Sequence, residues 1–153
     1  MTPRIGVGYD SHRFAAGRRL VLGGVEVEHD VGLAGHSDAD VVAHAIIDAV
    51  LGAAGLGDLG SHFPPDDARW KDADSLDLLR TAMAMVHGRV VNVDATVICE
   101  APELSAHRPE MERLLADAVG APVSVKATTN EGMGWIGRGE GIACVAVALL
   151  DAG

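Results

Sequence analysis

The segment from Gly141 to Leu150 is apolar on both of its alternating faces, and this feature constrains the fold more than any other. A strand of this kind must be covered on both sides. A chain of 153 residues forms one domain and has limited material for covering both faces of a sheet. We therefore expect a single domain over residues 1–153, with a partner subunit covering one face of this strand.

Hydrophobic periodicity predicts strands and helices that alternate along the chain. Strands are expected over residues 5–9, 89–100, 123–128 and 141–150, with a hairpin over 19–27 around Gly23-Gly24. Helices are expected over residues 38–52, 75–88 and 109–119, the first opened by a capping box of Ser37 and Asp40. Residues 55–65 are expected to form a loop. This pattern favours an α+β fold, a single-domain layered sheet with helices on one side, over a doubly wound sheet.

Composition narrows the function classes. The chain has 12 Lys and Arg against 22 Asp and Glu, a net charge of −10, which argues against binding a nucleic-acid backbone. An acidic protein that binds phosphorylated substrates is expected to recruit metal cations. The two cysteines are far apart within apolar runs, and no secretory signal pattern or membrane-length apolar run occurs. We therefore expect reduced thiols and a cytoplasmic location.

Three residues are candidate metal ligands. Asp10 and His12 lie two positions apart at the end of a strand, so their side chains point to the same face. His44 lies in an apolar helix, in a stripe with Asp40 and Asp48. Two imidazoles and one carboxylate are a common set for catalytic Zn²⁺ with an open fourth position. The spacing alone leaves open whether His12, His36 or His62 completes the set, and a core histidine is an equal alternative for His44.

Two glycine-containing segments have different interpretations. Residues 55–60 match a GxGxxG pattern, but they follow a helix and lead into Phe63-Pro64-Pro65, so a dinucleotide site is rejected. Residues 126–132 end a strand with hydroxyl groups that can hold phosphate oxygens, and Glu131 could bind a hard cation.

Trp135 is either a core aromatic or a lid, and residues 137–141 resemble a turn with one Arg. These residues indicate a metal-dependent enzyme acting on a phosphorylated small molecule.

Several motifs in a fixed order extend this interpretation over nearly the whole chain. They are Asp10–His12, Gly35–Val41, His44-Ala45, Asp48-Ala49, Gly57–Gly60, Phe63-Pro64, Ala73–Ser75, Lys126–Thr129 and Gly137–Ile142. Together they resemble the 2-C-methyl-D-erythritol 2,4-cyclodiphosphate synthase family. The resemblance implies an enzyme of the non-mevalonate isoprenoid pathway that cyclises 4-diphosphocytidyl-2-C-methyl-D-erythritol 2-phosphate and releases CMP.

The resemblance also implies roles for individual residues. Asp10, His12 and His44 are expected to bind one Zn²⁺ per subunit, and Glu131 to bind Mg²⁺ or Mn²⁺ together with the substrate. His36, on a loop that positions phosphates, and Thr129 are expected to be catalytic. The expected substrate-binding residues are Asp10, His12, His36, Ser37, Asp58, Gly60, Phe63, Asp67, Cys99, Ala101, Pro102, Ser105, Thr128, Thr129, Asn130, Glu131, Trp135 and Arg138. The family's members are homotrimers with active sites between adjacent subunits, which agrees with the doubly apolar last strand.

Two positions depart from the family's usual pattern. Glu103 stands where Lys is common, and Asn130 replaces Thr or Ser. Both belong to the expected nucleotide pocket, so they bear on cytidine binding rather than on metal chemistry. Two other functions use the same residues: a Zn²⁺-dependent phosphohydrolase, in which the metal activates water, and a trimeric metabolite-binding protein without turnover.

Overall fold

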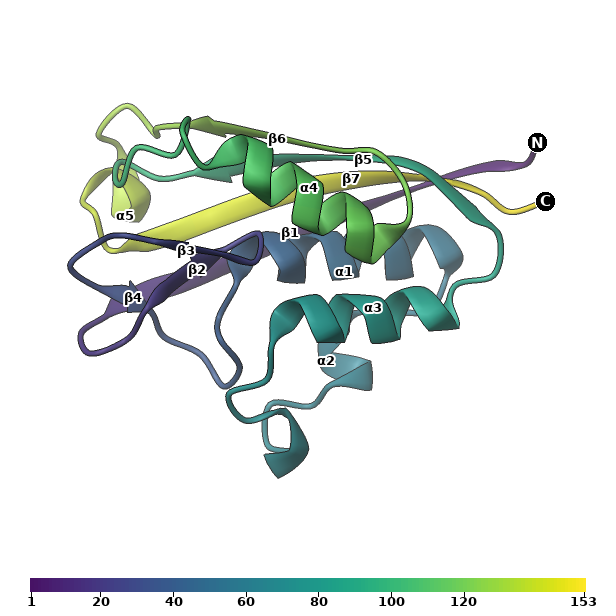
Figure 1. Ribbon diagram of the computed structural model, residues 1–153, viewed down its shortest axis with the longest axis horizontal. Helices are drawn as coiled ribbons and strands as arrows, with labels where there is room; N and C mark the ends of the chain where they lie inside the picture. Colours follow the sequence, from purple (N-terminus) through teal and green to yellow (C-terminus); the bar gives the residue numbers. More distant parts are fainter.

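A computed structural model describes residues 1–153 as a mixed sheet with helices packed against one face (Figure 1). The strands are β1 (Pro3–Ala15), β2 (Leu20–Leu22), β3 (Val25–Val27), β4 (Gly32–Leu33), β5 (Arg89–Ile98), β6 (Val123–Thr128) and β7 (Gly141–Asp151). The main sheet has the order β4-β1-β7-β5-β6, and only β5 and β6 are parallel. The hairpin β2-β3 stands apart. The expected α+β sheet with helices on one side is confirmed.

The helices follow the predicted pattern with three short additions, α2, η1 and α5. The helical elements are α1 (Val41–Ala54), α2 (Leu59–His62), the 3-10 turn η1 (Ala68–Trp70), α3 (Ser75–Met85), α4 (Arg108–Val119) and α5 (Gly134–Gly137). The prediction of a loop over residues 55–65 was wrong where α2 forms, and α5 was not predicted. The turn predicted over residues 137–141 is present at residues 138–140, directly after α5. Four-residue helices are too short to show a periodic apolar pattern. None of the helices has both the length and the apolar character that a membrane crossing requires.

Two glycines on β1 allow α1 to lie directly against the sheet. A Cβ atom at Gly6 would overlap the carbonyl oxygen of Ala49, and one at Gly8 would overlap that of Ala45. The backbone of α1 therefore packs directly against the backbone of β1, and the small residues Ala45 and Ala49 are fully buried there. This close approach brings His44, the neighbour of Ala45 on α1, to the face of β1 that carries Asp10 and His12.

The beginning of α1 differs from the prediction. Asp40, rather than Ser37, caps the helix, since its carboxylate accepts hydrogen bonds from the backbone N–H groups of Val42 and Ala43. The same carboxylate accepts the N–H groups of Gly23 and Gly24, which ties the β2-β3 hairpin to the helix. A side chain with four backbone donors outcompetes a serine for the cap. Ser37 is thereby free to contact His44.

Two strands also differ from their predicted form. β1 runs from residue 3 to residue 15, well beyond the predicted 5–9, because its polar half continues to pair with β7 as far as Arg13. β5 contains an irregularity between Val90 and Asn92 that leaves Val91 out of register with β7. Val90 is buried and Val91 only half-buried, so the predicted alternation holds only after the bulge.

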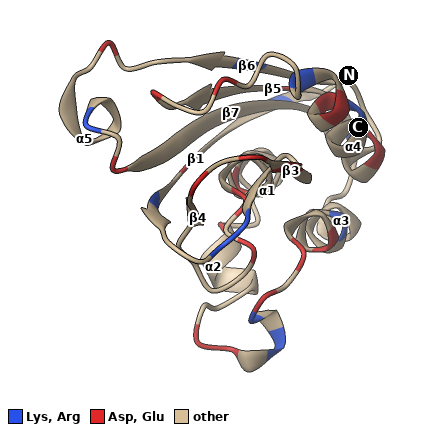
Figure 2. Cartoon of the chain, turned by 60° about the vertical axis from the view of Figure 1, so that its left-hand side comes forward, with Lys and Arg blue, Asp and Glu red and all other residues tan.

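The face of the sheet opposite the helices is open and apolar on β1 and β7. Ile5, Val7, Tyr9 and Val147 are between 45% and 76% exposed, and Val7 pairs directly with Val147. The few Lys and Arg residues are scattered among more numerous Asp and Glu residues around the molecule (Figure 2). Both cysteines are free and buried, as expected. The doubly apolar character of β7 is therefore confirmed, with one face uncovered within a single chain.

Candidate metal centre and its surroundings

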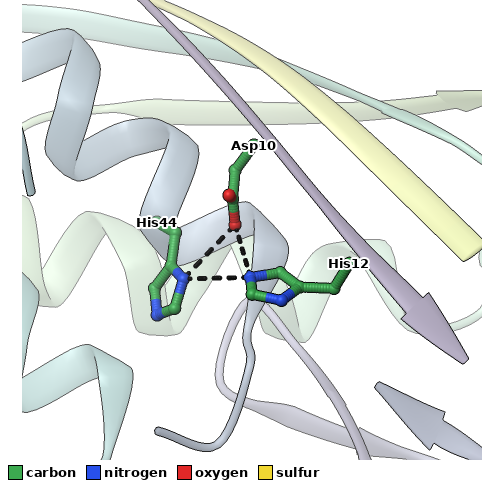
Figure 3. Close-up of side chains that lie close together, drawn as sticks. All are labelled: Asp10, His12 and His44. Atoms are coloured by element: carbon green, nitrogen blue, oxygen red, sulfur yellow. Dashed lines mark hydrogen bonds and ion pairs between the residues drawn. The ribbon is translucent and has the colours of Figure 1, made fainter. Parts of the chain in front are cut away.

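The three candidate ligands converge on one point between β1 and α1 (Figure 3). Asp10 Oδ2 lies 2.8 Å from His12 Nε2 and 3.3 Å from His44 Nδ1, and the two ring nitrogens are 3.4 Å apart. Ligand atoms of a tetrahedral zinc ion, each about 2.0–2.1 Å from the metal, are about 3.3–3.4 Å from one another. The triangle therefore has nearly the dimensions that such an ion requires.

The hydrogen bonds around the triad leave lone pairs facing its centre. His12 Nδ1 lies 2.7 Å from the carbonyl oxygen of Ala34, which can only accept, so this nitrogen carries the proton and Nε2 is free. Oδ2 of Asp10 is buried and has no hydrogen-bond partner. Lone pairs turned toward one another in a buried corner repel unless a cation lies between them. The residues present thus fit a metal ion.

In the metal-free protein, protons compete for the same site. Burial acts to raise the pKa of Asp10, but its contacts with His12 and His44 outweigh this and lower it below 3.8. Burial acts to lower the pKa of His12, but the contact with Asp10 and its negative charge raise it above 6.5. In the metal-free protein the contact therefore favours a protonated His12 beside an ionised Asp10.

The triad forms part of the wall of a cavity of about 210 Å³. The other lining residues are His36, Ser37, Leu59, Gly60, Phe63, Pro65, Trp70 and Leu78. Four of the expected substrate-binding residues, His36, Ser37, Gly60 and Phe63, thus lie beside the candidate ligands. The geometry also resolves the ambiguity among the histidines, because His62 instead contacts the carbonyl oxygen of Leu56 at 2.7 Å and His36 stands outside the triad.

The loop that carries His36 is held by Arg18, a residue that no sequence pattern singles out. Arg18 donates from Nη1 to the carbonyl oxygen of Gly35 at 2.8 Å and from Nη2 to that of Ser37 at 2.7 Å. The carbonyl oxygen of His36 accepts the N–H of Asp72 at 2.8 Å. Three successive carbonyl groups are therefore fixed, and the side chain of His36 extends from an anchored backbone. Only a three-dimensional contact identifies Arg18, which lies 18 positions before His36.

Two expected substrate-binding residues lie outside this cavity. Asp58 caps α2 by accepting the N–H of Ser61 at 2.9 Å, and the hydrogen bonds from Ser61 lower its pKa. Asp67 accepts hydrogen bonds from the Arg69 side chain and caps η1, and these contacts lower its pKa. Within a single chain, both carboxylates have local structural partners.

The expected nucleotide residues line a second, shallower cavity of about 150 Å³ at the ends of β5 and β6. Its lining includes Cys99, Glu100, Pro102, Glu103, Leu104, Ala127, Thr128 and Thr129. Ala101, which precedes a cis peptide bond to Pro102, and Ser105 are exposed beside it. Ser11, Ala143, Ile98 and Thr128 form one row across the sheet, so Thr128 lies three interstrand spacings, about 14 Å, from β1. The chain does not bring this group to the triad.

The loop after β6 is fixed by Glu100, which lies within the segment expected to form the nucleotide pocket. Glu100 accepts the N–H of Asn130 at 2.7 Å through Oε2 and the N–H of Gly132 at 2.9 Å through Oε1. Between them, Glu131 has a φ of 55°, which places its exposed side chain at a sharp turn. The amide of Asn130 donates to the carbonyl oxygen of Met133 at 2.9 Å, so its substitution for Thr or Ser adds a bond within the loop.

Trp135 and Arg138 surround a third region at the end of β1. Trp135 is half-buried and lines a cavity of about 560 Å³ with Ser11, His12, Arg13, Phe14, Gly139 and Glu140. This position favours a lining role over the alternative of a core aromatic. Arg138, exposed beside it, donates from Nε to Glu140 at 2.6 Å.

The fold is that of an α+β protein, a mixed sheet with helices on one face. Its candidate metal centre consists of two histidines and one carboxylate that open into a cavity. The model of the YgbB family matches residues 3–151, and the chain belongs to this family. It is 55% identical to the 2-C-methyl-D-erythritol 2,4-cyclodiphosphate synthase of Gloeobacter violaceus, covering 97% of this chain and 94% of that protein. It is 57% identical to the synthase of Salinibacter ruber, covering 97% and 98%.

A solved structure has the same fold. The complex of the Plasmodium falciparum IspF protein with CDP superimposes with a TM-score of 0.84 at 34% identity, over 97% of this chain and 96% of that one. The family resemblance inferred from the motifs is therefore confirmed.

Proposed function

We propose that the chain converts 4-diphosphocytidyl-2-C-methyl-D-erythritol 2-phosphate into 2-C-methyl-D-erythritol 2,4-cyclodiphosphate and CMP, as a lyase of the non-mevalonate isoprenoid pathway. One observation carries this proposal: the Asp10, His12 and His44 triad occurs in a chain more than half identical to relatives named for this cyclisation. We place the reaction in the cytoplasm, a reducing compartment in which buried free thiols persist.

The reaction needs no external reactant. An oxygen of the 2-phosphate forms a bond to the β-phosphorus of the diphosphate, and the bond from that phosphorus to the bridging oxygen of CMP breaks. The electron pair leaves with CMP. The attacking oxygen is already anionic, so no general base is required, and the protein's task is to hold two negatively charged groups in contact.

The residues divide this task between two cation sites. Asp10, His12 and His44 would hold Zn²⁺, and Glu131 would hold Mg²⁺ or Mn²⁺ with the substrate. When bound, these ions supply positive charge that polarises the phosphoryl oxygens and offsets the charge developing on the leaving group. The side chain of His36 would orient the phosphate, and Ser37 would contact the substrate beside it. Arg18 fixes the backbone of this loop through the carbonyl oxygens of Gly35 and Ser37. The hydroxyl of Thr129 would donate to the transferred phosphoryl group.

The remaining expected residues would bind the two ends of the substrate. Asp58, Gly60, Phe63 and Asp67 would contact the methylerythritol unit, and Trp135 and Arg138 the phosphates. The nucleotide pocket would comprise Cys99, Ala101, Pro102, Ser105, Thr128, Asn130 and Glu131. CDP in the solved Plasmodium falciparum complex supports a cytidine site in this family. Glu103 accepts the N–H of Ser105 at 3.1 Å, so the acidic residue supports the pocket's own loop.

A homotrimer with active sites between subunits would unite these two ends. The metal triad and the nucleotide pocket line separate cavities of one chain, and Thr128 of the pocket lies about 14 Å from β1 across the sheet. The exposed apolar residues of β1 and β7 offer a surface that water disfavours and that a second copy would cover. Light scattering of the purified protein would test this assembly, with a mass of three times 15.8 kDa as the expected result.

Phosphorus NMR with the cytidine diphosphate substrate tests the proposed reaction. Cyclic diphosphate and CMP are expected to appear together, and a chelator is expected to abolish both signals. Repeating the reaction in ¹⁸O-labelled water distinguishes a hydrolase, because cyclisation places no solvent oxygen in the product. Linear, labelled products would replace the proposal with a phosphohydrolase, and binding without turnover in the metal-loaded protein would replace it with a binding protein.

A further inference from the structure

The two histidines of the metal triad present different nitrogen atoms to its centre. His12 presents Nε2, and a backbone carbonyl on its Nδ1 fixes that choice. His44 presents Nδ1, so its Nε2 faces away from the centre. A neutral imidazole carries one proton, which exchanges between the two nitrogens unless a neighbour fixes it. If the proton of His44 resided on Nδ1, that nitrogen could not bind a metal.

The outward nitrogen of His44 meets a buried serine. Ser75 Oγ lies 2.9 Å from His44 Nε2, and Ser75 is fully buried at the start of α3. A serine hydroxyl both donates and accepts, so this contact by itself leaves the position of the imidazole proton undetermined. The direction depends on where the single hydrogen of Ser75 points.

Asp38 determines that direction. Its Oδ1 accepts the N–H of Asp40 at 3.1 Å and its Oδ2 accepts the N–H of Ser75 at 3.0 Å, so both oxygens act as acceptors. The hydroxyl of Ser75 is also within hydrogen-bond distance of Oδ1 and donates to it. With its hydrogen committed to Asp38, Ser75 Oγ can only accept from His44. The proton of His44 must then be on Nε2.

We propose that Asp38 and Ser75 form a hydrogen-bond relay that holds His44 in its Nε2–H form, which makes Ser75 a positioning residue for the metal site. The relay runs from His44 Nε2–H to Ser75 Oγ and from the Ser75 hydroxyl to Asp38, and it leaves the lone pair of Nδ1 directed at Asp10 and His12. Partners that orient metal-bound histidines in this way commonly change metal affinity 10–100-fold when removed. The inference rests on the metal site of the proposed function.

Ser37 provides a matched control within the same contact. Its Oγ lies 3.1 Å from the same Nε2, and it accepts the N–H of Ala39 at 3.2 Å. No carboxylate fixes its hydroxyl hydrogen, so Ser37 does not set the direction of the bond. Ser37→Ala removes one hydroxyl beside His44 and leaves the relay intact, whereas Ser75→Ala removes the relay itself.

Zn²⁺ affinity, measured by competition with a chelator and without substrate, tests the relay independently of the reaction. Ser75→Ala is expected to weaken Zn²⁺ binding about tenfold or more, and Ser37→Ala to change it less than about threefold. Circular dichroism of the metal-free variants checks that both are folded. Equal affinities for Ser75→Ala and the unmodified chain would overturn the proposal, even if the cyclisation itself is confirmed.

A second measurement requires no substitution. Two-bond ¹⁵N–¹H correlation of the histidine rings in the Zn²⁺-loaded protein reports which nitrogen carries the proton. We expect His44 to be protonated on Nε2 and His12 on Nδ1. A His44 ring protonated on Nδ1 would contradict the relay, whatever the affinities of the variants.

Discussion

The metal corner, formed by Asp10, His12 and His44, and the nucleotide pocket at the ends of β5 and β6 differ in how far a single chain completes them. The metal corner takes its ligands from a long strand and a long helix, and the outer nitrogens of both histidines have hydrogen-bond partners within the chain. The nucleotide pocket combines buried residues, such as Cys99 and Leu104, with exposed residues at the ends of β5 and β6, and its cavity is smaller, about 150 Å³ against 210 Å³. If the proposed homotrimer forms, one chain would suffice to bind metal, whereas nucleotide binding and turnover would need the assembled protein.

The most damaging change to the metal corner is the loss of a ligand. His44→Ala removes one of three ligand atoms, and we expect loss of stoichiometric Zn²⁺ and a fall in turnover of at least about 10³-fold, since metal-assisted charge stabilisation supplies several kcal/mol. Metal analysis and the NMR assay measure the two effects. Asp10→Ala is expected to behave in the same way.

Folding of these variants is checked by circular dichroism, because His44 contributes little to the apolar core. Retention of one Zn²⁺ per chain in both variants would refute the assignment of the ligands and remove the basis of the comparison.

The second change separates the two regions. Val7→Glu places a charge on the exposed apolar face of β1, with the side chain directed away from α1. We expect a monomer that retains Zn²⁺ and loses at least about a hundredfold in turnover, because the nucleotide pocket of a neighbouring chain is no longer present. Light scattering and metal analysis measure mass and occupancy. Val7→Ile is the matched control. A monomer with full turnover would show that one chain forms a complete site.

The sequence allowed the metal corner to be predicted more fully than its supports. Asp10, His12 and His44 carry recognisable chemistry, and the resemblance selected His12 where spacing alone left His36 and His62 open. Ser75 lies in one of the matching motifs, Ala73–Ser75, but the motif assigned it no role, and Arg18 lies in none of them. Each acts through a contact between segments 17 to 31 residues apart, and a lone Ser or Arg is compatible with many roles.

The fold shows the same difference in predictability. Long elements with a regular apolar pattern were predicted well, whereas helix caps and single-turn helices were not. Long periodic segments such as α1 and β7 were predicted within a few residues. The start of α1 was misassigned because Asp40 has four backbone donors, two of them from a hairpin that the sequence does not place beside it. Helices α2 and α5 were missed because one turn has no period. The separation of the two cavities is a property of strand order, which periodicity does not determine.

A smaller effect is expected when the support of the nucleotide pocket is removed. Glu100→Ala deletes the acceptor of two backbone N–H groups that shape the loop of Glu131. We expect KM to rise about tenfold, equivalent to about 1.4 kcal/mol, with Zn²⁺ occupancy unchanged. Steady-state kinetics and metal analysis measure both. Glu110→Ala, which removes an exposed carboxylate bonded to Arg113, is the control. A loss of Zn²⁺ in Glu100→Ala would show that the two regions are not independent.

The smallest effect concerns how pH acts on the metal corner. The pKa of His12 is raised above 6.5 in the metal-free chain, so the stability it contributes is present below 6.5 and is lost as pH rises through its folded-state pKa. The pKa of Asp10 is lowered below 3.8, so its contribution is present above 3.8 and is lost only as pH falls through its folded-state pKa. Zn²⁺ requires neutral His12, so its affinity rises over the range in which the metal-free ion pair weakens.

The difference in Tm between Zn²⁺-loaded and metal-free protein should therefore widen by a few degrees from pH 6 to pH 8. Differential scanning fluorimetry at fixed Zn²⁺ concentration measures it, because a bound ligand adds stability in proportion to the logarithm of one plus the ratio of the Zn²⁺ concentration to Kd, and Kd falls as the affinity rises. His12→Ala, which lacks one of the three ligands, should show almost no difference in Tm at any pH. A difference in the unmodified chain that stays constant from pH 6 to pH 8 would mean that the proton displaced by the metal leaves from a group other than His12.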